Sequence, residues 1–175
     1  MKVSSHSVLA RWLVGGALFA VMALACAGIP AAPDKRHPTG QELVDVFYTH
    51  QEEFKTLHLM ALEDEGLEWV SPVHTLPEDP EPLGITPQRV AEYRALFQEL
   101  GLEKGVYSFD DKTSLTFIAS ELSWVKGYLY ADRCPGTLVE DIDQAWNEYS
   151  TSETTSYAFC QLIEGNWYLF LSSGD

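Results

Sequence analysis

The sequence has few basic residues. Its 175 residues include 11 lysines and arginines against 26 aspartates and glutamates, which gives a formal net charge of −15 at pH 7. Residues 1–25 contain two of the basic residues and no acid, so residues 26–175 carry 9 basic and 26 acidic residues, a net charge of −17. Such a chain repels phosphate backbones, which disfavours nucleic-acid binding. Its acidity favours either simple solubility or a basic protein partner.

The sequence also lacks the short motifs that usually indicate an enzyme. No glycine-rich phosphate loop follows an expected strand, and no metal-ligand spacing, nucleophile elbow or cysteine–histidine pair stands out. Pairs of carboxylates are numerous only because acids are numerous. We therefore expect no catalytic residue, no metal ion and no cofactor.

Long apolar runs are missing except near the N-terminus. Residues 1–25 combine a charged start, an apolar stretch from Trp12 and small residues at the end, which is the layout of a signal peptide for export. Residues 26–38 contain three prolines and few large apolar side chains, as expected of a tether. We expect residues 39–175 to form a single domain.

Cysteine is scarce, and Cys26 directly follows the expected signal peptide. The sequence Ala-Leu-Ala-Cys resembles the lipobox of bacterial lipoproteins, in which cleavage precedes the cysteine and its sulfur is diacylated. The resemblance implies lipidation of Cys26 and a membrane anchor, although Ala23 stands where the family prefers leucine. Without lipidation, cleavage after Ala25 or Ala27 would give a periplasmic or secreted protein.

Two cysteines remain in the expected domain, Cys134 and Cys160. In an oxidising compartment outside the cytoplasm they are expected to form one disulfide. Two separate buried thiols are the alternative, because spacing alone cannot supply the required geometry.

The hydrophobic periodicity predicts an α+β fold. Apolar residues at helical spacing indicate one amphipathic helix over residues 40–65 and a second from Thr86 to Gly101, separated by a proline-rich linker. From Gly105 the period changes to two, which indicates strands over residues 106–110, 113–120 and 124–131. A crossing segment, read as a short helix or an ordered loop, leads to a closing strand pair around Gly165. The prediction is two helices followed by a mainly antiparallel sheet of about five strands.

Two motifs in this sheet carry a resemblance. Lys126-Gly127-Tyr128 and the closing Glu164-Gly165-Asn166-Trp167-Tyr168 resemble the C-terminal half of a group of small uncharacterised bacterial exported proteins. The similarity extends over about residues 89–171. It supports the predicted order of elements and implies no catalytic residues.

Aromatic residues are concentrated in the expected strands. An antiparallel sheet covered by helices on one side leaves its other side to water or to a partner. Aromatic residues on that side would form a binding surface; the alternative is that they are buried beneath a helix. The candidates are Tyr107, Trp124, Tyr128, Tyr130, Trp167 and Tyr168.

These observations favour a non-enzymatic protein of the bacterial envelope that binds a partner through an acidic and aromatic surface. One alternative is a hydrolase of envelope substrates that uses acids with His50, His58 or His74. Another is an inhibitor or immunity-like protein against a basic enzyme.

Overall fold

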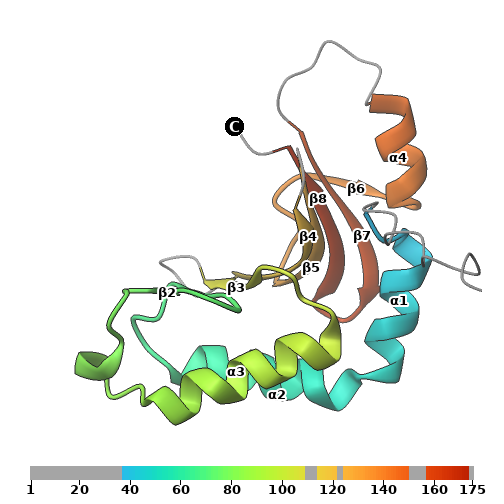
Figure 1. The fold of residues 1–175 in the computed structure, drawn as a ribbon. Helices are drawn as coiled ribbons and strands as arrows, with labels where there is room; N and C mark the ends of the chain where they lie inside the picture. Colours follow the sequence, from blue (N-terminus) through green and yellow to red (C-terminus); the bar gives the residue numbers. More distant parts are fainter. Residues whose placement is uncertain (1–36, 109–113, 122–123, 150–156, 174–175) are drawn as a thin grey trace, which may run out of the picture. The chain divides into compact units, whose positions relative to one another are not determined.

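The computed structural model describes residues 37–108, 114–121, 124–149 and 157–173. These residues form an α+β fold, in which four α-helices cover one face of an eight-stranded sheet of order β2-β1-β3-β4-β5-β8-β7-β6 (Figure 1). The α+β class is therefore confirmed, whereas the predicted numbers of helices and strands were too low. The expected signal peptide, Cys26 and most of the tether lie outside the described residues. Within the described ranges, no helix is both long enough and apolar enough to cross a membrane.

The first predicted helix is two helices, α1 (Gly40–Thr49) and α2 (Gln51–Glu63). The chain breaks at His50, where φ is −123° and ψ is 37°, although the His50 amide still donates to the Val46 carbonyl at 3.0 Å. The break lets α1 lie against β8 while α2 lies beside α3 (Figure 1). No glycine or proline marks this change of direction, so the periodicity alone predicted one continuous helix.

Helix α3 (Pro87–Leu100) begins and ends as predicted. The Thr86 side chain accepts a hydrogen bond from the Arg89 amide at 3.2 Å, and Pro87 occupies the first turn, where a missing N–H does no harm. Gly101 ends the helix with a φ of +67°, a conformation that glycine adopts without strain.

The sheet contains three strands beyond the predicted five. The linker contributes the short hairpin of β1 and β2 and a 3₁₀ turn over Glu81–Leu83, and the crossing segment contributes both β6 and α4 (Ile142–Tyr149). Strand β6 runs parallel to β7, because α4 carries the chain back along the sheet between them. The strands are β1 (Trp69–Val70), β2 (Thr75–Leu76), β3 (Gly105–Ser108), β4 (Ser114–Glu121), β5 (Val125–Ala131), β6 (Thr137–Val139), β7 (Ala158–Glu164) and β8 (Trp167–Ser172).

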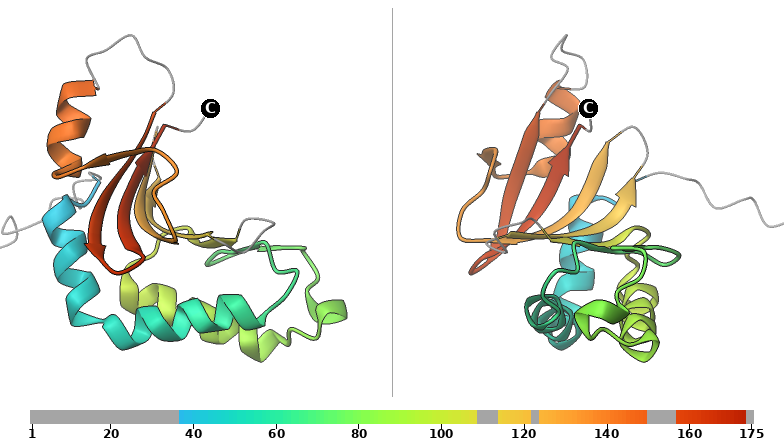
Figure 2. Two further views of the ribbon diagram at one scale, coloured as in Figure 1. Left: turned by 180° about the vertical axis from the view of Figure 1, so that it is seen from behind. Right: turned by 90° about the vertical axis from the view of Figure 1, so that its left-hand side faces the viewer.

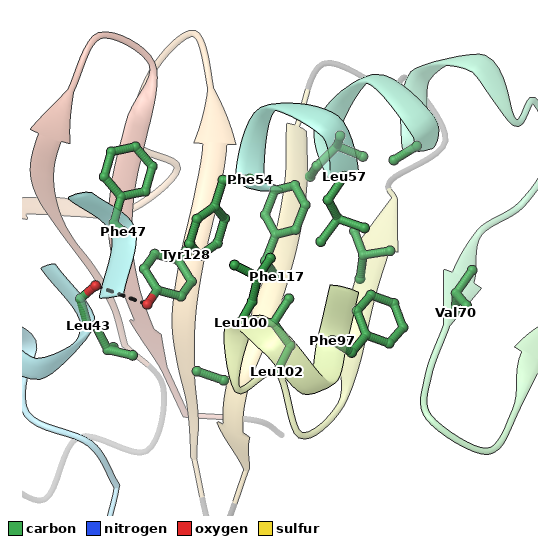
Figure 3. Close-up of a cluster of buried hydrophobic side chains, with 14 of the residues drawn as sticks. Leu43, Phe47, Phe54, Leu57, Val70, Phe97, Leu100, Leu102, Phe117 and Tyr128 are labelled. Carbon is green, nitrogen blue, oxygen red and sulfur yellow. Dashed lines mark hydrogen bonds between the residues drawn. The ribbon is translucent and has the colours of Figure 1, made fainter. Parts of the chain in front are cut away.

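The main core lies between the helices and one face of the sheet. Tyr128 on β5 is fully buried, and its hydroxyl donates to the Leu43 carbonyl of α1 at 3.0 Å (Figure 3). The Tyr128 ring lies 4.5 Å from the ring of Phe54 on α2, measured between centroids. Phe54 also contacts Phe117 on β4, so α1 and α2 are held on the same face of the central strands.

A buried lysine ties the start of α1 to this sheet. Lys126, on β5, has a side chain only 2% exposed. Its ammonium group donates to the Pro38 carbonyl at 2.7 Å and to the Asp143 carboxylate on α4. The other Asp143 oxygen accepts from the Gly40 amide at 2.6 Å. One carboxylate therefore joins α4, the N-terminus of α1 and the middle of the sheet.

Candidate functional site on the open face of the sheet

No helix of the described chain covers the second face of the sheet. The helices contact side chains on the Tyr128 face, including Trp167 with Phe47 and Gln161 with the Ile142 amide. The right-hand view of Figure 2 looks onto the opposite face, with α1 and α4 behind the strands. We call this side, which carries Tyr107 and Tyr168, the open face.

Paired positions place a continuous row of side chains on the open face. Residues directly opposite each other on neighbouring strands project to the same side of a sheet. The strand register therefore shows which residues belong to the row, whether they are exposed or buried. From β2 to β7 they are Leu76, Trp69, Tyr107, Thr116, Leu129, Tyr168 and Leu162.

A second row runs beside the first from β4 to β6 and contains Ile118, Gly127, Phe170, Cys160 and Leu138. Gly127 leaves this row without a side chain at its centre. A Cβ atom there would lie 2.1 Å from the Phe117 carbonyl oxygen, because β4 is irregular between Ile118 and Ser120. Only glycine fits this close approach of two backbones.

The edges of the open face expose large apolar side chains. Leu162 is 52% exposed and Leu138 is 61% exposed, and both line a hollow between β6 and β7. Tyr107 on β3 is 36% exposed, and Tyr168 and Phe170 in the middle are half-buried. The open face thus offers both aliphatic and aromatic contact area to a partner.

The predicted disulfide is present and lies on this face, because Cys160 belongs to its second row. Cys160 is fully buried there in a small second core with Leu129 and Ala131, against which Cys134 packs. Cys134 and Cys160 are bonded, with their Cα atoms 5.9 Å apart, and the bond links the β5–β6 connection to β7. Beside it lies a hollow of about 790 Å³, lined by Ser114 and by residues 131–135. Asp132 and Arg133 bring one charge of each sign to this hollow, and the Asn166 amide donates to Asp132 at 3.2 Å.

The six predicted binding residues do not form one surface. Tyr107 and Tyr168 lie on the open face, whereas the other four project toward the helices. Tyr128 is fully buried, and Tyr130 and Trp167 pack against His58. The residues on the helix side are Trp124, Tyr128, Tyr130 and Trp167. The sequence pattern did not separate the two groups, because both faces of these strands carry aromatic residues.

The histidines of the hydrolase alternative occupy different environments. His50 lies at the α1–α2 junction, His58 stacks on Tyr130 with centroids 3.9 Å apart, and His74 is exposed in the β1–β2 turn. Burial lowers the pKa of His58 below its ordinary value of 6.5. The hydroxyl of Ser71 bonds the backbone of His74 and not its imidazole. These contacts explain the local packing without a nucleophile–base pair.

An aromatic stack lies at the other end of the helix side. The His37 ring lies 3.4 Å from Trp124, and Trp124 lies 4.2 Å from Trp146 on α4, measured between centroids. Burial, together with the nearby charge of Lys126, lowers the pKa of His37. Trp124 therefore helps to hold His37, the first described residue, against the domain.

Comparison with known proteins gave no match to any family model, curated protein or solved structure.

Proposed function

We propose that the protein is an exported, non-enzymatic binding protein of the bacterial envelope, anchored to the membrane through a lipid on Cys26. Its partner is a basic protein segment that docks on the open face. If Cys26 is not lipidated, the same domain would act in the periplasm or outside the cell. The disulfide between Cys134 and Cys160 supports export, because such bonds persist in oxidising compartments.

The observation that carries this proposal is that no helix of the described chain covers the open face, whose edges expose large apolar side chains. Four helices are available, and all contact the opposite side of the sheet. Tyr168 and Phe170 remain half-buried, and Leu162 and Leu138 remain exposed. Large apolar side chains gathered on one face are typical of interaction sites.

The negative charge of the chain favours a basic partner. The net charge of −17 on residues 26–175 repels other acidic molecules and steers basic ones toward the surface. Glu140 follows β6 at the edge of the open face, beside Leu138 and Leu162. A basic enzyme held by an inhibitor-like protein would be one partner of this kind, and it would be bound stoichiometrically.

A matched set of variants tests the proposal. The purified protein is immobilised, exposed to an envelope extract, and the retained proteins are quantified by mass spectrometry. A double variant, Tyr107→Ala with Leu162→Ala, alters the open face at two exposed positions. Leu59→Ala is the control, since Leu59 is 47% exposed on α2 and lies outside the open face.

We expect a basic protein that the wild type and the Leu59→Ala variant retain equally, that the double variant loses, and that about 0.5 M NaCl releases through charge screening. Reconstitution with that purified protein should give a one-to-one complex. An identical set of retained proteins for the wild type and the double variant would refute docking on the open face. Retention of nothing beyond an inert control protein would refute the binding function itself.

A further inference from the structure

Helices α2 and α3 run side by side in opposite directions, and a charged cluster bridges one end of the pair. Arg89, in the first turn of α3, donates to Asp64 at 2.8 Å and to Glu63 at 2.9 Å. It also lies 3.7 Å from Glu92 on its own helix. At this end, a guanidinium group neutralises the carboxylates that face each other across the two helices.

The other end of the same pair has a different composition. Glu53 lies in the first turn of α2, Glu99 lies in the last turn of α3, and His50 lies at the junction that precedes α2. One ligand atom from each of the three residues lies within 4.8 Å of those of the other two. The His50 Nδ1 atom is 3.8 Å from a Glu53 oxygen, which is too long for a hydrogen bond.

No arginine or lysine of the described chain pairs with Glu53 or Glu99. Two carboxylates from different helices therefore meet beside an imidazole, with no lysine or arginine of the described chain paired to either of them. Like charges at this separation repel each other, so a cation at this place would stabilise the helix pair as Arg89 does at the opposite end.

We propose that His50, Glu53 and Glu99 form a binding site for a divalent transition-metal ion of the zinc type. The mixed ligand set supports this class of metal, because zinc accepts imidazole nitrogen and carboxylate oxygen, whereas calcium and magnesium prefer oxygen alone. Zinc–ligand bonds of about 2.0–2.2 Å place tetrahedral ligands roughly 3.3 Å apart. The ligand atoms now lie up to 4.8 Å apart, and the exposed Glu99 side chain can shorten this separation by a change of rotamer.

The environment of the cluster also fits a metal site. The side chains of His50 and Glu53 are 29% and 34% exposed, so they are held by the helices yet remain accessible. Three protein ligands leave one tetrahedral position for water or for a group from a partner. The proposal is independent of docking on the open face, because all three ligands belong to the helix layer.

Zinc titration of the full chain tests the site. The purified protein is stripped with EDTA and titrated with ZnCl₂ by isothermal calorimetry at about pH 7.5, because protons compete with zinc for its ligands. Variants Glu99→Gln and His50→Gln each remove one ligand. Glu99 is exposed, so its variant is expected to fold normally. Glu52→Gln and His74→Gln are matched controls at exposed positions outside the cluster.

We expect one zinc ion for each chain and a rise in melting temperature on binding. Each ligand variant should weaken binding by on the order of tenfold or more, while both controls bind zinc as the wild type does. Cobalt(II) should give the absorption bands of a bound nitrogen and oxygen site, which Glu99→Gln should lose. Absence of zinc binding to the wild type would overturn the proposal, as would equal affinity in Glu99→Gln. Calcium that binds as tightly as zinc and survives His50→Gln would overturn the assigned metal class.

Discussion

Lys126 is a lysine in the middle of a sheet, with almost none of its side chain exposed. A buried ammonium group is tolerated only where its charge is paired and its hydrogen bonds are made. Asp143 supplies the charge, and the Pro38 carbonyl accepts a second bond. Because Asp143 also accepts from the Gly40 amide, loss of Lys126 would remove the cation that pairs with this carboxylate and leave the Pro38 carbonyl without its donor.

The substitution Lys126→Met tests this reading. It keeps the volume of the side chain and removes the charge, and we expect it to lower the free energy of unfolding by about 2 kcal/mol. Chemical denaturation followed by tryptophan fluorescence measures the change. Asp143→Asn in the same chain should recover part of the loss, since the amide oxygen can still accept from Gly40. A single variant as stable as the wild type would show that the pair contributes little.

His58 predicts how stability responds to pH. Its Nε2 atom is buried without a hydrogen-bond partner, and burial lowers the pKa of the imidazole below 6.5. As the pH falls below 6.5, the unfolded chain therefore takes up the proton before the folded chain does. The stability that neutral His58 provides is present above pH 6.5 and is lost as the pH falls toward the lower folded-state pKa.

We expect the substitution His58→Phe to reduce this pH dependence. Phenylalanine can keep the stack on Tyr130 and cannot be protonated. Free energies of unfolding measured between about pH 7 and pH 5 should therefore fall less steeply than in the wild type. His74→Gln, at an exposed position, should keep the wild-type slope. If the His58→Phe and wild-type curves are parallel, the buried imidazole has no part in acid sensitivity.

The Lys126-Gly127-Tyr128 motif shows what could be read from the sequence at single positions. The Lys-Gly-Tyr motif predicted a strand, and the strand is present as β5. Its three members have separate roles: Lys126 is paired with Asp143, Gly127 admits the β4 backbone, and Tyr128 fills the core. None of these roles depends on a local pattern, because each partner lies on another element.

At the scale of elements, the disulfide joins the β5–β6 connection to β7, next to the short parallel strand β6. Strand β6 has three residues and lies at the edge of the sheet, where β7 is its one neighbour among the described strands. Such a short edge strand contributes few backbone hydrogen bonds of its own. The covalent link therefore fixes the segment that leads into β6.

We expect the double variant Cys134→Ser with Cys160→Ser to be less stable by about 3 kcal/mol, because the bond closes a loop with a sequence separation of 26 residues. Thermal and denaturant unfolding with and without a reducing agent measure the loss. The reductant should destabilise the wild type and leave the double variant unchanged. Equal stability of the oxidised and reduced wild-type protein would contradict the expectation.

Element boundaries were predictable where local chemistry decides them. Thr86, Pro87 and Gly101 marked both ends of α3, and Gly165 marked the final hairpin. The break at His50 and the parallel strand β6 were not predictable, because both depend on how the helices fit a twisted sheet. The proposed metal site was missed for the same reason, since Glu99 approaches His50 only through the packing of α3 on α2.

At the scale of the whole molecule, export remains a prediction of the sequence. We expect the protein from the membrane fraction to begin at Cys26 and to carry the mass of acyl chains, and to gain two hydrogens on reduction of the Cys134–Cys160 bond. Intact mass spectrometry of the membrane and soluble fractions measures both. A Cys26→Ser variant should move to the soluble fraction. A soluble wild-type protein that begins at Gly28, or at Cys26 without the mass of acyl chains, would rule out the anchor.

The contact between Lys126 and Pro38 has a mechanical consequence. Strand β5 has four strands on one side and three on the other, and its lysine holds the chain one residue after His37. A domain pulled through the chain that precedes His37 would receive the force at this interior strand and at the start of α1. The strand ladders on both sides would then share the load, whereas a pull on β2 or β6 would peel hydrogen bonds away one after another. The Lys126 contact therefore attaches the N-terminal end of the described chain to the interior of the sheet, away from its edge strands β2 and β6.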